Sequence, residues 1–578
     1  MSLAAPQIER LQAPLVIGVT GHRDLRQHDL PHLEKLVRHV LGRLRERYPS
    51  TPLVVLSPLA EGADRLVARA GFAFGARLVV PLPLPAALYE QDFEEPGSVD
   101  EFRALLAQAE CSFVLPPEPD LAAIRNPGLE RDRRYELAGS YVVQQSQIFI
   151  ALWDGVESGK VGGTSAMVKL RTEGRREARQ FELQPLELFP VYHIVTPRRS
   201  NPNPAREAFQ LREIYPPVFQ HGQNGETYYA KALRNLDVFN RTIQDGTLLH
   251  EAADSRRGLV REKTPWLSGS LELALEQYAI TDALAIRYHR KNVRTHAALH
   301  ILVFVSFLCF VLFGEWGEFR PWWLFASLLV LAVALVTHRF GRRRAFDDES
   351  LDYRAVAEGA RVRFFWRMAG VHESVSDNYL EEQRTELDWI RNALRAWDAA
   401  AGWPARTEAP ENARPPVEFA LKHWVEHQHR YFAKAARSNR ERGEQIERSV
   451  KIAVYLVLAA AIGVAIAALV NSFFNYGWWD EPRREWLKWP LMAIDLLLAI
   501  GALSHHFGER MAYSEHSKLY RRMEEVFRSA RAMAAERMQA DDLDGARAVL
   551  LKLGQEALAE NGGWVLLHRD RPLELPHP

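Results

Sequence analysis

The chain has 578 residues, too many for one compact core, so at least two domains are expected. Its 73 lysines and arginines are balanced by 73 aspartates and glutamates, which excludes a general attraction to polyanions, so direct nucleic-acid binding is not expected. The two cysteines, Cys111 and Cys309, have no spacing typical of a disulfide framework or a zinc site, and neither a metal nor a cofactor is predicted.

The amino-terminal segment lacks the apolar stretch of a secretory signal. Pro6, Glu9, Arg10 and Gln12 interrupt every apolar run there. We therefore expect the amino-terminal domain to remain in the cytosol.

Between Pro14 and about Pro197, short apolar runs alternate with stretches typical of helices. This alternation predicts β-α units and hence an α/β fold, a doubly wound, mainly parallel, Rossmann-like domain at residues 10–200. Ligands of such sheets bind at the carboxyl ends of the strands. The expected strands are Leu15–Val19, Leu53–Leu56, Arg77–Leu82, Cys111–Leu115, Ile148–Trp153 and Val191–Val195.

Three loops that follow expected strands combine glycine with polar side chains. Glycine lets the backbone approach a phosphate closely, and the N–H groups that open the next helix are donors favoured by the helix dipole. Because these loops meet at one edge of the sheet, the sequence predicts a phosphate or nucleotide site there. The residues are Thr20, Gly21, His22 and Arg23 after the first strand, Ser57, Glu61, Gly62 and Asp64 after the second, and Asp154, Gly155, Gly162, Gly163 and Thr164 after the fifth.

The residues of this predicted site divide by their chemistry. The expected phosphate and ribose contacts are Gly21, His22, Arg23, Gly62, Gly163 and Thr164, among which the Arg23 guanidinium suits a bidentate contact. The carboxylates of Glu61, Asp64 and Asp154 are candidates for contacts to hydroxyls or to a base.

These loops carry a resemblance to a known family. The Thr20–Arg23 start, the Ser57–Asp64 turn, the Tyr135–Gly139 stretch and the Gly162–Thr164 turn together resemble the SLOG superfamily of nucleotide-binding, Rossmann-like domains. The resemblance covers about the first 200 residues. It implies that the amino-terminal domain binds a nucleotide.

One position departs from the enzymes of that superfamily. In the LOG phosphoribohydrolases, the glycine-threonine turn is followed by a glutamate used in cleaving the N-glycosidic bond, whereas Met167 stands at that position here. A methionine cannot act as an acid or a base, so no catalytic residue is assigned. A nearby carboxylate such as Glu136, Asp154 or Glu61 could substitute, which leaves hydrolysis open.

Four apolar runs follow in two close pairs, about 297–313 with 322–337 and about 452–470 with 487–503. Each run approaches the length of about 17 to 25 residues that a helix needs to cross the hydrocarbon core. Lysines and arginines flank the outer ends of both pairs, and tryptophans gather at the turns, which predicts outward-facing turns and cytoplasmic termini. The tryptophans are Trp316, Trp322, Trp323, Trp478, Trp479, Trp486 and Trp489.

Asp495 lies inside the fourth run. An ionised carboxylate in contact with lipid would cost several kcal/mol, so we expect this residue to face the helix bundle, a partner helix or water. Its role is either that of a pore-lining or gating group or that of a protonated structural aspartate near the membrane edge.

The remaining segments are expected to be mainly helical. Residues 201–270 are interpreted as a connector, 271–401 and 402–540 as two helical modules with two membrane helices each, and 541–578 as a cytosolic tail. Each module has a basic helix, an apolar hairpin and a returning helix, which favours a duplicated unit. His423, His427 and His429 lie near Glu426 without forming an HExxH pattern, which favours a solvated helix face over a metal site.

The membrane part is similar to SLATT effector modules, which occur joined to SLOG sensors. This resemblance implies a bacterial anti-phage system in which a nucleotide-derived ligand controls a pore-forming or membrane-disrupting domain in the inner (cytoplasmic) membrane. Four helices make a thin wall for a pore, so a homo-oligomer in the lipid bilayer is expected. The alternatives are a membrane-anchored nucleotide N-glycosidase, of the phosphoribohydrolase or NADase type, and a scaffold with a vestigial pocket.

Overall fold

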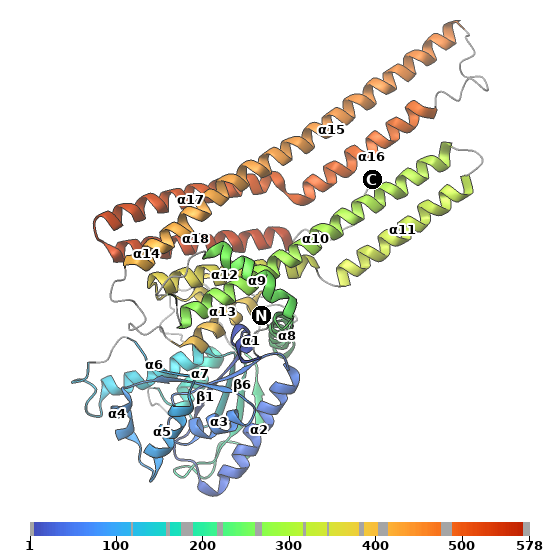
Figure 1. The fold of residues 1–578 in the computed structure, drawn as a ribbon. Coiled ribbons are helices and arrows are strands. Elements are labelled where there is room, and N and C mark those ends of the chain that lie inside the picture. Colours follow the sequence, from blue (N-terminus) through green and yellow to red (C-terminus); the bar gives the residue numbers. More distant parts are fainter. Residues whose placement is uncertain are drawn as a thin grey trace. The chain divides into compact units, whose positions relative to one another are not determined.

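The structure is a computed structural model. It describes residues 5–116, 120–157, 162–174, 189–216, 224–260, 267, 269–315, 320–343, 346–380, 387–402, 414–474 and 488–569. The chain divides into two compact units (Figure 1). The first unit comprises Met1–Ile280 and Gly359–Ala413, and the second comprises Thr281–Glu358 and Arg414–Pro578.

The first unit is built on a seven-stranded sheet with the order β4-β3-β2-β1-β5-β6-β7. All neighbouring strands are parallel except β6 and β7. The chain adds strands outward from β1 as far as β4 and then continues from β5 on the other side, so the winding reverses between β1 and β5. The strands are β1 Leu15–Gly21, β2 Leu53–Leu56, β3 Arg77–Leu82, β4 Cys111–Val114, β5 Ile148–Trp153, β6 Val191–Val195 and β7 Leu211–Ile214.

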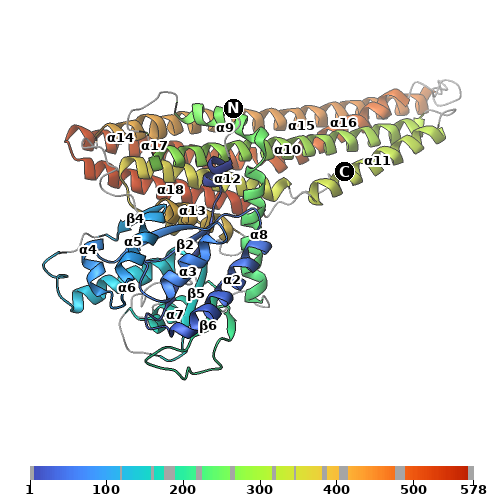
Figure 2. The ribbon, with the colours of Figure 1, turned by 60° about the horizontal axis from the view of Figure 1, so that its bottom comes forward.

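Helices cover both faces of this sheet (Figure 2). Successive residues of a strand point to opposite faces, so Ile17 lies with α2 and α3 whereas Val16 lies with α6 and α7. One face carries α2 Leu30–Arg47, α3 Ala63–Phe72 and α5 Ser98–Gln108, and the other carries α6 Leu129–Gln145, α7 Thr164–Glu173 and α13 Asp388–Ala401. Short elements of the same unit are α1 Ala5–Leu11, η1 Gln27–Asp29, α4 Ala86–Tyr89, η2 Glu90–Asp92 and η3 Val375–Asn378.

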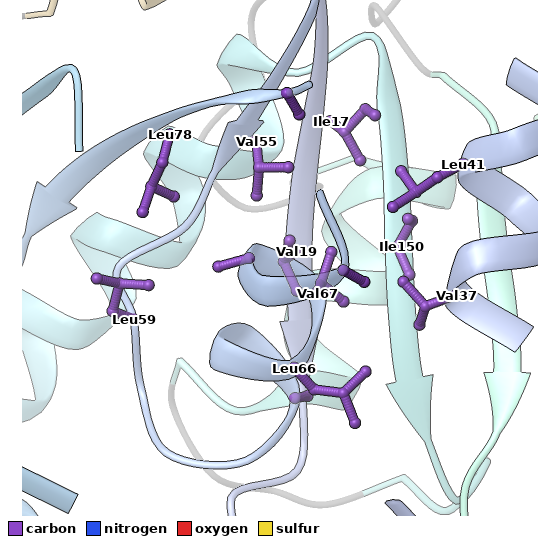
Figure 3. Packing of buried hydrophobic residues seen from close by; sticks show 14 of the residues in the cluster. Ile17, Val19, Val37, Leu41, Val55, Leu59, Leu66, Val67, Leu78 and Ile150 are labelled. Atoms are coloured by element: carbon purple, nitrogen blue, oxygen red, sulfur yellow. The ribbon is translucent and has the colours of Figure 1, made fainter. Parts of the chain in front are cut away.

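The larger buried cluster fills the space between the sheet and α2 and α3 (Figure 3). Aliphatic side chains from β1, β2, β3 and β5 meet Val37 and Leu41 of α2 and Val67 of α3. These three helix residues have no exposed surface. Burying one such side chain contributes about 1.5 to 3 kcal/mol, so this layer fixes the strands whose carboxyl ends form the site.

The predicted α/β fold is confirmed, because each of the six expected strands is present and the sheet is mostly parallel. The edge strand β7 was not predicted. Its four residues, Leu211–Ile214, are half-buried and place two charged side chains between two apolar ones, a pattern too short and irregular to stand out in the sequence.

The predicted connector contains further ordered structure that belongs to the first unit. Helices α8 Gly225–Ile243 and α9 Gly246–Leu259 follow β7. The buried Asn240 side chain of α8 donates to the Ala13 carbonyl oxygen at 2.8 Å and accepts from the Ala13 N–H at 2.9 Å. The Asp237 carboxylate accepts hydrogen bonds from Ser50 and Thr51 just before β2. These bonds attach α8 to the amino-terminal ends of two strands.

Helix α13 differs from the prediction in its location, because the sequence placed it in the first membrane module. Ala396 and Ala399 of α13 pack with Val16 of β1 in the second buried cluster. Close by in the same unit, the buried Arg363 of α12 (Phe346–Ala369) forms an ion pair with Asp398 at 2.6 Å. Gly359–Ala413 therefore belongs to the unit that contains the sheet and not to the unit that contains the membrane helices.

The described residues of the second unit form helices. These are α10 Gly269–Glu315, whose first residues belong to the first unit, α11 Arg320–Arg343, the start of α12, α14 Arg414–Ala420, the π-helical turn Leu421–Val425, α15 Glu426–Phe474, α16 Lys488–Met511, α17 Tyr513–Gln539 and α18 Leu543–Arg569. Helices α15 and α16 run side by side in both ribbon views, as do α10 and α11 (Figures 1 and 2).

Among the residues that the structure describes, four helices are long and apolar enough to cross a membrane. They lie within Gly269–Gly314, Pro321–Gly341, Arg414–Phe474 and Lys488–Gln539, and each contains one of the predicted apolar runs. At most 22% of any apolar stretch is buried inside the chain, so most of this apolar surface faces outward. A soluble protein rarely leaves such surface in water, which makes this a membrane protein.

Polar side chains within these helices have two different environments. The hydroxyls of Ser306 in α10 and Ser327 in α11 each donate to the other residue's carbonyl oxygen, at 3.0 and 2.9 Å, and so join the first hairpin. Asp495 of α16 is instead exposed on its helix. Of the predicted turn tryptophans, Trp322, Trp323 and Trp489 are described, whereas the other four lie outside the described residues.

Candidate ligand-binding cleft

A cleft of about 560 Å³ opens where the carboxyl ends of β1 and β5 flank the reversal of winding. Sheets of this kind bind ligands at that place. Of the thirteen predicted residues, nine line the cleft: Thr20, Gly21, His22, Arg23, Glu61, Asp64, Gly162, Gly163 and Thr164. Ser57, Gly62, Asp154 and Gly155 are not among the lining residues.

Gly21 and Gly62 allow two loops to pack against each other. The backbone of Gly62 has a φ of +77°, and an added Cβ would lie 2.5 Å from the carbonyl oxygens of His22 and Arg23. A Cβ on Gly21 would lie 2.3 Å from that of Ala63. Both glycines therefore bring the loop after β1 onto the amino end of α3, which explains these positions without a ligand.

The amino end of α3 is already occupied by protein groups. The Ala63 N–H donates to the His22 carbonyl oxygen, and the buried Asp64 carboxyl accepts from the Ala60 N–H at 3.3 Å. Burial raises the pKa of Asp64 to about 7, although the Ala60 bond and the Arg23 charge oppose that shift. An acidic group in the first turn disfavours a phosphate at this helix end.

The amino end of α7 is the better place for an anion. Gly162 has a φ of +72°, Gly163 is the residue before the helix, and the first turn contains no acidic side chain. Gly163 has no side chain with which to cap the helix, and Thr164 and Ser165 line the cleft. The first N–H groups of α7, with the positive end of its dipole, therefore suit a phosphate.

Asp154 organises the floor behind the cleft. Its buried carboxylate accepts from the Arg198 Nε and the Asn201 Nδ2, both at 2.9 Å, and from the Val156 N–H at 3.1 Å. Burial opposes ionisation, but these hydrogen bonds and nearby cations hold the pKa of Asp154 below its usual value. Asp154 therefore holds the segments after β5 and β6 together as an anion at neutral pH.

His22 lies between this floor and the cleft. Its Nε2 lies 3.0 Å from the backbone nitrogen of Asp154 and 3.1 Å from the Asp154 Oδ1. Burial lowers the pKa of His22, and the neighbouring Asp154 carboxylate only partly offsets this effect. A neutral His22 lines the cleft as a polar side chain and contributes no positive charge that would attract a phosphate.

Glu61 positions the segment after β3. Its carboxylate accepts from the N–H groups of Glu94 at 3.0 Å and Glu95 at 3.1 Å. Burial opposes ionisation, whereas bonds from Ser98 and from those N–H groups lower the pKa of Glu61. The Glu61 oxygens are thus engaged in holding a cleft wall.

Several lining residues were not predicted. The Arg23 guanidinium lies 5.2 Å from the ring centre of Tyr135, whose hydroxyl donates to Asp92. Arg198 and Arg199 lie in the loop that follows β6 and line the same edge. The rule that selected the other loops, polar residues at the carboxyl end of a parallel strand, applies to these two arginines as well.

The cleft contains charges of both signs. Three arginines and six carboxylates line it: Arg23, Arg198, Arg199, Asp24, Glu61, Asp64, Glu94, Glu95 and Asp132. Such a lining suits a ligand that combines anionic groups with hydroxyls better than one that is only a cluster of phosphates. Among the described residues, no group of three or more His, Cys, Asp or Glu is placed to hold a metal ion.

Comparison with known proteins gives no relative from which to transfer a function: no family model, no curated protein and no solved structure matches this chain.

Proposed function

We propose that the chain is a membrane effector in which the cytosolic α/β unit binds a nucleotide-derived signal and thereby controls a pore-forming or membrane-disrupting helical domain. The observation that carries the proposal is the combination, in one chain, of a polar cleft at the reversal of a parallel sheet with four membrane-length helices. The SLOG-like and SLATT-like sequence features described above agree with this combination and favour a role in bacterial anti-phage defence.

The chemistry of the cleft supports a nucleotide-derived ligand. Its volume of about 560 Å³ lies within the range of about 300 to 1,000 Å³ typical of small-molecule sites. The amino end of α7 and the guanidinium of Arg23 suit a phosphate, and Asp64 suits a ribose hydroxyl. The rings of Tyr135 and Trp153 in the lining offer apolar surface for a base.

The connectivity of the chain supports control of one unit by the other. The chain passes between the units after Ile280, after Glu358 and after Ala413. The first two passages fall inside the helices α10 and α12, and α10 continues into the first membrane span. For a nearly complete switch, the ligand must bind one state more tightly by about 5.5 kcal/mol, a difference that several subunits of a homo-oligomer would share.

Binding of nucleotides to the purified full-length chain in detergent tests the proposal. We expect calorimetry to detect binding of AMP, ADP-ribose or NAD, and Arg23→Ala to weaken it at least about tenfold, as expected for the loss of a charge-assisted hydrogen bond. Arg38→Ala, which removes an exposed arginine paired with Glu34 on α2, is the control and should leave affinity unchanged. Absence of binding by the wild type would contradict the proposal.

A second candidate function is a membrane-anchored nucleotide N-glycosidase. The observation that favours it is Asp64, a cleft carboxyl whose pKa of about 7 suits proton transfer at neutral pH. Met167 at the position of the expected glutamate opposes it, because this side chain is buried against Gly139 and has no proton to exchange. Release of adenine from AMP or of nicotinamide from NAD by the wild type, abolished by Asp64→Asn, would establish the enzyme.

A further inference from the structure

We propose that Glu95 is an internal substitute for the anionic group of the ligand: its carboxylate pairs with Arg199, and a phosphate of the ligand displaces it from that arginine. This inference rests on the proposed function, because it assigns the residue that recognises the anion in the same cleft. Arg199 Nη2 and Glu95 Oε1 lie 2.5 Å apart. Both residues line the cleft, Arg199 from the segment after β6 and Glu95 from the segment after β3.

The backbone that carries Arg199 is firmly placed. The Arg199 N–H donates to the Asp24 carbonyl oxygen at 2.9 Å, and the Asp24 carboxylate accepts from the Ser200 N–H at 3.1 Å. On the other side, the neighbouring Arg198 is bonded to the buried Asp154. The Arg198 side chain therefore has a structural role, because it is bonded to Asp154. The half-exposed Arg199 side chain is instead paired with Glu95 on the opposite wall of the cleft.

The backbone of Glu95 is fixed independently of its side chain. Glu61 accepts the N–H groups of Glu94 and Glu95, so the segment stays in place when the Glu95 carboxylate leaves Arg199. The exchange of partners then requires rotation of two side chains and no unfolding of either segment. This arrangement separates the positioning residue, Glu61, from the residue that competes with the ligand, Glu95.

The energetics favour displacement by a phosphate. The side chains of Arg199 and Glu95 are 52% and 37% exposed, and ion pairs with that exposure are weak because water and salt screen them. A phosphate monoester carries up to two negative charges and accepts two parallel bonds from one guanidinium. A ligand that is also held at the amino end of α7 presents its phosphate to Arg199 at a high effective concentration. The phosphate therefore outcompetes the Glu95 carboxylate for Arg199.

The experiment compares two neutralising substitutions next to each other in the chain. Glu95→Gln removes the proposed competitor, and Glu94→Gln removes the same charge from the adjacent lining residue as the matched control. Calorimetry on the full-length chain uses inorganic phosphate and AMP as probes. We expect Glu95→Gln to raise the affinity for both probes about twofold to fivefold above the effect of Glu94→Gln, the factor for losing an exposed ion pair.

Arg199→Ala completes a double-mutant cycle with Glu95→Gln. It should lower the affinity for both probes, and in its background Glu95→Gln should have no more effect than Glu94→Gln. Equal effects of the two glutamine variants, or a gain from Glu95→Gln that persists without Arg199, would overturn the inference while leaving nucleotide binding intact. A wild-type chain that binds neither probe would instead contradict the proposed function, so the two failures are distinguishable.

Discussion

The charge of Asp64 connects the stability of the cleft to pH. Because burial raises its pKa in the folded state to about 7, protonation stabilises the fold, and this contribution is lost as the pH rises from about 4 to 7. Asp64→Asn removes the titration but keeps an oxygen that accepts the Ala60 N–H. We expect the variant to gain about 2 to 3 kcal/mol relative to the wild type between pH 5 and pH 8.

Thermal midpoints of both proteins in detergent at pH 5 and pH 8 check this expectation. A difference between wild type and variant that does not change with pH would show that Asp64 is ionised throughout the range. The same measurement decides whether Asp64 carries a proton to donate at neutral pH, which the alternative enzymatic function requires.

Gly62 shows why a glycine in this cleft is needed for packing. Gly62→Ala should destabilise the first unit by about 2 to 4 kcal/mol, because a Cβ would collide with two backbone carbonyls at a positive φ. Gly75 is the matched control, since its φ is +70° and no atom lies within 4 Å of a Cβ there. Gly75→Ala should cost about 1 kcal/mol. Equal losses of thermal midpoint in the two variants would contradict this account.

At the residue scale, the sequence identified where the cleft lies better than what each residue does. Residues at the ends of strands were found because parallel strands bring their carboxyl ends to one edge. The tasks of Asp154 and Glu61 depend on partners 44 and 33 positions away, Arg198 and Glu94, which no local pattern reveals. The pairing of Arg199 with Glu95 was hidden for the same reason.

At the scale of elements, α8 depends on a small number of buried polar contacts. The Asn240 amide satisfies both the N–H and the carbonyl of Ala13, which precedes β1. Asn240→Ala leaves these groups buried and unpaired, so we expect a loss of about 2 to 4 kcal/mol in stability. Thr242→Ala on the same helix is the control, because the Thr242 hydroxyl donates to the Val238 carbonyl of its own helix. A similar fall in thermal midpoint for both variants would refute this role.

The elements that escaped prediction are those stabilised by partners distant in sequence. Long apolar runs predict the central strands and the membrane helices from local pattern alone. β7 is a four-residue edge strand, and α13 is amphipathic like any surface helix, so nothing local shows that it packs on the sheet. Its alanines Ala396 and Ala399 share a buried cluster with Val16, far away in the sequence, which only the folded chain reveals.

At the scale of the whole molecule, Asp495 is the clearest test of a pore. It lies in a membrane-length helix and is exposed on the single chain, so lipid, water or a neighbouring subunit must surround it. If it lines a pore, Asp495→Asn should reduce cation conductance of reconstituted protein several-fold through loss of a charged ring. The control variant is Asn471→Ala, which changes a polar residue near the end of α15. Unaltered conductance in Asp495→Asn would assign this residue a structural role.

The central claim is that binding in the cleft alters the membrane helices, and ion flux from liposomes containing the purified full-length chain tests it most directly. Flux is recorded before and after addition of AMP, ADP-ribose or NAD for the wild type and for Arg199→Ala. The account predicts a flux that changes with a nucleotide in the wild type and requires a higher concentration of it in the variant. A wild-type chain that binds the nucleotide but shows the same flux with and without it would contradict the account.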